Sequence, residues 1–145
     1  MSLRRLRLGE YVASAGCACV IVSFLLPAYH SPIGDLSAWN TFGPALALEF
    51  AALFAGLAMV ISAATERSTA LPVATQVWCV PISLLAVIAA LIRVLERPEH
   101  ATSVAAGSWL GLIGTCVILM GAWLSMRDER TSLYEPARPV PRPRP

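Results

Sequence analysis

The sequence predicts an all-α membrane protein with four transmembrane helices in an antiparallel up-down bundle, and three observations predict it. Hydrophobic residues make up 57% of the 145 residues and charged residues only 14%, whereas soluble domains carry about 25% charged residues. Four windows reach the roughly 20 mainly apolar residues that a spanning helix needs. Most of the arginines lie in the segments that this topology places on one side of the membrane. The chain is also too short for two sizeable domains.

The four windows are almost free of charge. Glu49 is the one charged residue of the second window, and Arg93 stands near the end of the third. The first and fourth windows have none. The predicted spans are residues 11–29, 44–64, 71–95 and 105–126.

Prolines mark several limits of these helices. Pro44 and Pro72 stand in the first turns of the second and third windows, where a missing N–H costs nothing. Pro27 closes the first window and Pro98 follows the third. Pro81 lies inside the third window, removes a helix hydrogen bond and predicts a kink there. Gln76, one turn earlier, is predicted to form a hydrogen bond with a neighbouring helix.

The arginines predict the orientation. The loop after the second window holds Arg67, while the opposite side holds only Arg93 and Arg97. Cytoplasmic loops carry the excess of arginine, so both termini are expected in the cytoplasm of a bacterial plasma membrane. The other arginines precede the first window or follow the fourth, and they are Arg4, Arg5, Arg7, Arg127, Arg130, Arg138, Arg142 and Arg144.

Two segments outside the bundle follow from this topology. Residues 1–10 form a basic cytoplasmic N-terminus, and residues 127–145 form a cytoplasmic tail rich in proline and arginine. Alternating prolines prevent helix and sheet, so the tail is predicted to be extended. The net charge of +2 is small and the arginines stand at segment ends, so nucleic acid is not an expected partner. The expected partners are the lipid bilayer and other membrane subunits or a second copy.

Glu49 is the residue that most needs an explanation, because a charge inside a bilayer marks a functional site by default. It lies about 7 Å from the outer end of its helix at 1.5 Å per residue. The third helix returns to the same side and ends near Arg93. Since a paired charge is cheaper to bury than a lone one, we predict an ion pair between Glu49 and Arg93. A charge separation above about 6 Å would contradict it.

Small residues line one face of the fourth window when it is projected at about 100° per residue. Such faces let two helix backbones approach closely in lipid. The stripe serves either packing inside the bundle or contact with another subunit, and the sequence leaves both open. Its members are Gly107, Gly111, Gly114, Gly121 and Ser125.

Aromatic residues near the helix ends fit the belt that anchors membrane proteins at the headgroup level. The sequence between the first two windows, AYHSPIGDLSAWNTFG, is the most distinctive loop, and its 35–39 portion suggests a short interfacial turn. The predicted anchors are Tyr29, Trp39, Phe42, Trp109 and Trp123.

Catalytic and metal motifs are not recognisable in the sequence. The cysteines lie within apolar windows, where cysteine usually behaves as a small hydrophobe, so neither disulfide exchange nor a cofactor is expected. His30 and His100 share the outer side with several acids but lack the spacing of a metal motif. The four cysteines are Cys17, Cys19, Cys79 and Cys116.

The order of elements resembles uncharacterised small four-span membrane proteins of actinobacteria. The resemblance covers roughly residues 4–130 and rests on FLLPAY, GDLSAW, ALPVA, GSWLGL and GAWLSMRDER. Ala28 stands where those proteins often have tryptophan in L-P-W-Y. The resemblance implies the four-span topology and no particular activity.

Three functions are therefore considered, and the third, an integral membrane enzyme, lacks any recognisable constellation of residues. The first is a non-enzymatic accessory or scaffold subunit that packs through its small-residue helix faces. The alternative is a small transporter or proton-coupled carrier that uses Glu49. Small multidrug exporters also have four spans and an essential glutamate, but theirs lies in the first span, so membership is not inferred.

Overall fold

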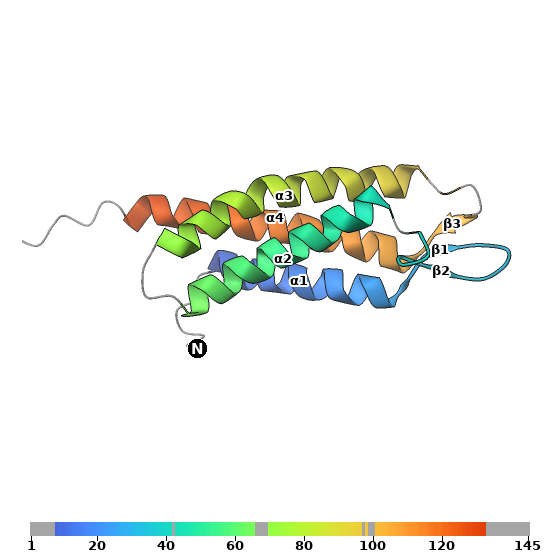
Figure 1. Ribbon diagram of the computed structural model, residues 1–145, viewed down its shortest axis with the longest axis horizontal. Helices are drawn as coiled ribbons and strands as arrows, with labels where there is room; N and C mark the ends of the chain where they lie inside the picture. The colour runs from blue at the N-terminus through green and yellow to red at the C-terminus, as the bar shows by residue number, and fades with distance from the viewer. Residues whose placement is uncertain (1–7, 42, 66–69, 97, 99–100, 133–145) are drawn as a thin grey trace, which may run out of the picture.

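Four helices account for most of the computed structural model, which describes residues 8–41, 43–65, 70–96, 98 and 101–132, with the side chains of 70–73 and 128–132 excepted. Each helix is long and apolar enough to span a membrane. They lie alongside one another as an elongated four-helix bundle (Figure 1). The helices are α1 (Leu8–Leu25), α2 (Pro44–Thr65), α3 (Ala70–Leu95) and α4 (Ala106–Ser132).

The first helix differs from its predicted span at both ends. α1 begins at Leu8 and ends at Leu25, so residues 26–29 are not helical. Pro27 explains the early end, because a proline disfavours the helical conformation of the residue before it. The amide of Leu26 donates a last hydrogen bond to the carbonyl of Ser23. The apolar sequence continues through Leu26, which is why hydrophobicity alone placed the end too late.

The other helices lie near their predicted limits. α2 begins at Pro44, and the Ala47 amide donates to the Gly43 carbonyl at its start. α4 continues six residues past the predicted end at 126, through a charged segment that extends beyond the apolar span. α3 includes Pro81 within one continuous helix, and the kink expected there stays a prediction.

A small antiparallel sheet at one end of the bundle is an addition to the predicted all-α fold. β1 (Pro27–His30) lies between β2 (Leu36–Ser37) and β3 (Ser103–Val104). Figure 1 shows it where α1 ends and α4 begins. β2 takes the place of the first part of the turn predicted over 35–39.

The sheet joins the two loops at this end of the bundle. Tyr29 pairs with Leu36 on one side and Val104 on the other. The amide of Ala105 also donates to the carbonyl of Ala28 at 2.9 Å. These bonds satisfy backbone groups that would otherwise lie unpaired beside the apolar bundle. The strands have only two to four residues, too few to show an alternating pattern.

The bundle is closed most tightly between α1 and α4, which run in opposite directions. A Cβ atom on Gly9 would lie 2.7 Å from the carbonyl oxygen of Gly121, and one on Gly16 would lie 2.8 Å from that of Gly114. Real Cβ atoms do not come this close to backbone. Only the absence of side chains lets the two backbones meet, as small residues permit in lipid.

Candidate functional site

Glu49 and Arg93 lie together at the sheet end of the bundle. Glu49 stands in the second turn of α2 and Arg93 in the last turn of α3. Arg93 Nη1 is 3.8 Å from Glu49 Oε1, and the two side chains are 11% and 7% exposed. This distance is that of an ion pair and exceeds that of a hydrogen bond. The separation is below the limit of about 6 Å set for the predicted pair.

The remaining nitrogens of Arg93 have partners outside α2. Nη2 donates to Thr41 Oγ1 at 2.7 Å, and Nε donates to the hydroxyl of Tyr29 at 3.2 Å. The rigid fork of a guanidinium places donors in several directions at once. Arg93 therefore ties α3 to α2, to β1 and to the segment before α2.

Tyr29 contacts Arg93 in three ways. Its hydroxyl accepts from Nε and donates to the Arg93 backbone carbonyl at 2.8 Å. The guanidinium carbon also lies 5.6 Å from the centre of the Tyr29 ring, within the range of a cation–π interaction. Tyr29 therefore binds both the backbone of the last turn of α3 and the side chain of Arg93.

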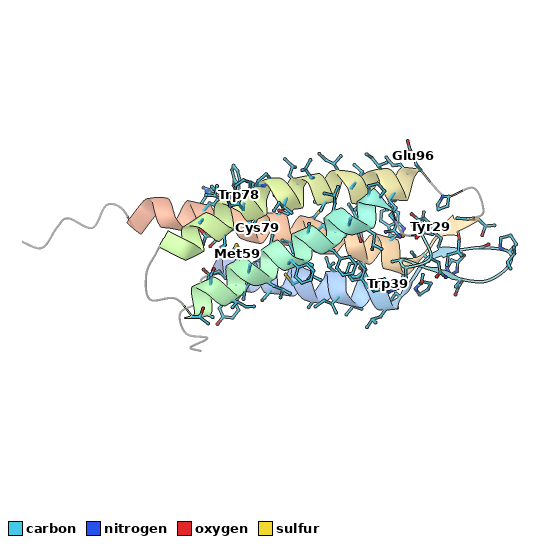
Figure 2. The ribbon with its side chains drawn as sticks, in the orientation of Figure 1. Tyr29, Trp39, Met59, Trp78, Cys79 and Glu96 are labelled. Carbon is cyan, nitrogen blue, oxygen red and sulfur yellow. The ribbon has the colours of Figure 1, made fainter. Side chains whose placement is uncertain are left out.

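The prediction that Tyr29 is an interfacial anchor is wrong. Its side chain is 0% exposed, so it cannot reach the lipid headgroups. Because α1 stops at Leu25, Tyr29 belongs to strand β1, which returns over the end of the bundle. Figure 2 shows Tyr29 at the sheet end of the bundle.

The other predicted anchors differ from Tyr29. Trp39, Trp109 and Trp123 are 54%, 51% and 56% exposed. Trp39 donates through Nε1 to the carbonyl of Phe24 at 3.2 Å and packs on the Phe24 ring at 6.0 Å. Phe42 lies outside the described residues.

The small-residue stripe of α4 is covered by α1 and, at Gly107, by the segment that leads into β1. A Cβ on Gly114 would lie 2.9 Å from the Val20 amide nitrogen, and one on Gly107 would lie 2.6 Å from the Pro27 carbonyl oxygen. Ser125 is fully buried. These positions pack inside the bundle, and the alternative of a seam for another subunit does not fit them.

Gly111 is the exception within the stripe. A Cβ there would lie 3.5 Å from Glu49 Oε2 and 3.4 Å from Ser23 Oγ, which is ordinary van der Waals contact. The carboxylate of Glu49 therefore lies where α1, α2 and α4 meet. Ser23 Oγ donates to the Val20 carbonyl at 2.7 Å.

The predicted interhelical bond of Gln76 is confirmed. Its Nε2 donates to Ser125 Oγ at 2.8 Å, linking α3 to α4. Gln76 is 2% exposed. Its Oε1 has no hydrogen-bond partner among the described residues.

The other candidate reactive groups in the described residues are the cysteines and His30. Cys17 and Cys79 are buried, Cys19 is half-buried and Cys116 is exposed, and all four thiols are free. His30 Nδ1 lies 2.6 Å from Asp35 Oδ1 on the sheet, where both side chains are more than half exposed. In the described part of the chain, no three His, Cys, Asp or Glu residues converge as metal ligands do. His100 lies outside the described residues.

Two residues near helix ends have roles that the sequence did not predict, and Tyr29 has a different role from the predicted one. Thr41 and Tyr29 bind Arg93, and no sequence pattern marks them as its partners. Glu10 is 4% exposed near the start of α1, although it was assigned to the N-terminal segment. The helix start at Leu8 explains this, since Glu10 belongs to the first turn.

The fold defines a four-helix membrane protein in which the Glu49–Arg93 pair lies at the sheet end. No protein family, curated protein or solved structure matches the chain. The geometry of the site can fix helices by ion pairing and hydrogen bonding. It would carry a proton only if Glu49 were released from Arg93.

Proposed function

We propose that this chain is a non-enzymatic accessory or scaffold subunit of a bacterial plasma membrane, with both termini in the cytoplasm. The observation that carries the proposal is the Arg93 network. Three side chains from different segments, those of Glu49, Tyr29 and Thr41, lie within 3.8 Å of the guanidinium nitrogens of Arg93. An acid held in this way supports a structural role rather than a transport cycle.

A second observation supports contact with another membrane subunit. The groove between α2 and α3 has a volume of about 420 Å³, and four alanines line it together with four larger residues, Phe54, Thr75, Trp78 and Ile82. Figure 2 shows Trp78 directed away from the bundle. Small residues between large ones allow a further helix to approach closely. The alanines are Ala51, Ala55, Ala58 and Ala74.

Co-purification from the native membrane tests this proposal. We expect larger membrane subunits to accompany the tagged wild-type chain in mild detergent, and the exposed Ala58→Trp substitution to abolish their recovery by filling the groove. Ile88→Trp is the matched control, because Ile88 is 47% exposed on α3 and lies outside the groove. Recovery of the chain alone from every preparation would contradict the scaffold function.

The alternative function is a small proton-coupled carrier that uses Glu49. One observation favours it: Oε2 faces Gly111 and Ser23, while Oε1 faces Arg93. Such a carrier must break the Glu49–Arg93 pair in each cycle. Each break leaves the Arg93 guanidinium buried without its counter-charge, which is costly. Solute flux across liposomes driven by a pH gradient, and lost in Glu49→Gln, would support the carrier.

A further inference from the structure

A groove between α3 and α4 opens on the outside of the bundle. It has a volume of about 570 Å³ and an almost wholly apolar lining. Both helices are membrane-spanning by length and composition, so the groove opens toward lipid chains. Its lining residues are Val80, Leu84, Cys116, Leu119, Met120 and Trp123.

One outward face of α4 continues this groove to a charged end. Cys116, Met120, Trp123 and Arg127 are all exposed, and they follow one another at the three- and four-residue spacing of a single helix face. Arg127 lies about 6 Å beyond Trp123 along the axis at 1.5 Å per residue. The face thus passes from apolar groups to an indole and then to a cation.

This sequence of groups is complementary to a phospholipid. Apolar side chains accommodate an acyl chain, and tryptophan favours the headgroup level of the bilayer. A guanidinium binds phosphate through paired N–H donors. Basic positions beside grooves between membrane helices attract anionic headgroups. Arg127 is not among the lining residues of the groove and stands one turn beyond Trp123 on the same exposed face of α4.

We infer that the α3–α4 groove is a binding site for an anionic phospholipid of the surrounding bilayer. One acyl chain lies along Met120 and Leu84, Trp123 lies at the level of the glycerol, and Arg127 binds the headgroup phosphate. This inference does not depend on whether the chain is a scaffold or a carrier.

Lipid retention measured by native mass spectrometry tests the site. The full chain is released from mixed micelles containing phosphatidylglycerol or phosphatidylcholine with identical acyl chains. We expect phosphatidylglycerol to be retained about fivefold better, the effect of one arginine near an anionic headgroup. Arg127→Gln should abolish this preference, and Arg127→Lys should keep part of it.

A second variant tests the groove itself. Met120→Trp fills it, and since Met120 is 61% exposed the fold should tolerate the larger side chain. We expect it to reduce the retention of both lipids. Ile61→Trp is the control, because Ile61 is 50% exposed on α2, away from the groove, and it should retain lipid as the wild type does. An unchanged preference in Arg127→Gln, or unchanged retention in Met120→Trp, would overturn the inference.

Discussion

The α1–α4 contact and the Arg93 network hold the same bundle by opposite means. Between α1 and α4, Gly121 and Gly9 bring backbone against backbone, with no room for one added carbon. At the sheet end, Arg93 binds through long polar side chains to Glu49 and its other partners. The first region is therefore sensitive to added atoms, and the second to lost ones.

Removing the carboxylate is expected to have the largest effect. Glu49→Ala leaves Arg93 buried without its counter-charge, and we expect a loss of about 3 kcal/mol in the free energy of unfolding. Unfolding by denaturing detergent in mixed micelles measures it. Glu96→Ala is the control, because Glu96 is exposed at the end of α3 and should change the stability by less than about 0.5 kcal/mol.

A double-mutant cycle separates the pair from its surroundings. Arg93→Ala combined with Glu49→Ala should cost about 1–3 kcal/mol less than the sum of the single losses. The same unfolding assay gives all four values of the cycle. Additive losses would mean that the 3.8 Å contact contributes no coupling and that Arg93 acts only through Tyr29 and Thr41.

Adding one carbon to the α1–α4 contact should come next. A Cβ on Gly121 would lie 2.6 Å from the Gly9 carbonyl oxygen and 2.8 Å from the Cα of Ala13. The Gly121→Ala variant must separate the two helices, and we expect a loss of about 2 kcal/mol. Gly43→Ala is the matched control, since its Cβ would meet only the Thr41 oxygen at 3.9 Å. Equal stability of the two variants would contradict close packing.

Removing the Tyr29 hydroxyl should have a smaller effect. Tyr29→Phe keeps the ring but leaves Arg93 Nε and the Arg93 carbonyl without this partner. We expect a loss of about 1.5 kcal/mol, typical of a hydrogen bond to a charged group. In an Arg93→Ala background the loss should be smaller, because only the hydrogen bond from Tyr29 to the backbone carbonyl of residue 93 remains to be removed. An interfacial role for Tyr29 would instead predict no change.

The smallest effect is expected at the exposed contact between His30 and Asp35. His30 and Asp35 approach to 2.6 Å, closer than Glu49 and Arg93, yet both side chains are more than half exposed. Asp35→Asn should therefore cost less than about 1 kcal/mol. Any loss should shrink in 1 M salt, where exposed charges are screened. A loss as large as that of Glu49→Ala would show that burial does not decide the difference.

The helices and the charged pair could be predicted for related reasons. Long apolar windows have few alternatives to a spanning helix, and Glu49 and Arg93 were the two charges placed near the same end. The strands could not be predicted, because segments of two to four residues are too short to show an alternating hydrophobic pattern. The place of Tyr29 depended on where α1 ends, and only Pro27 signalled that end.

The partner of the glycine stripe also lay beyond sequence reasoning. α1 carries its own small residues, including Gly9 and Gly16, and so does α2. Spacing identifies a face that can approach another helix, but not which helix covers it. The distances between Gly9 and Gly121 supply that assignment.

Proton-linked flux in liposomes tests most directly the claim that Glu49 stabilises the fold and does not carry protons. The wild type and Glu49→Gln are reconstituted with an internal pH indicator, and proton entry is measured under a pH gradient together with the thermal unfolding of each protein. We predict that neither form exceeds protein-free liposomes, while Glu49→Gln unfolds at a lower temperature. Flux through the wild type that disappears in an equally stable Glu49→Gln would contradict the account and establish Glu49 as a transport residue.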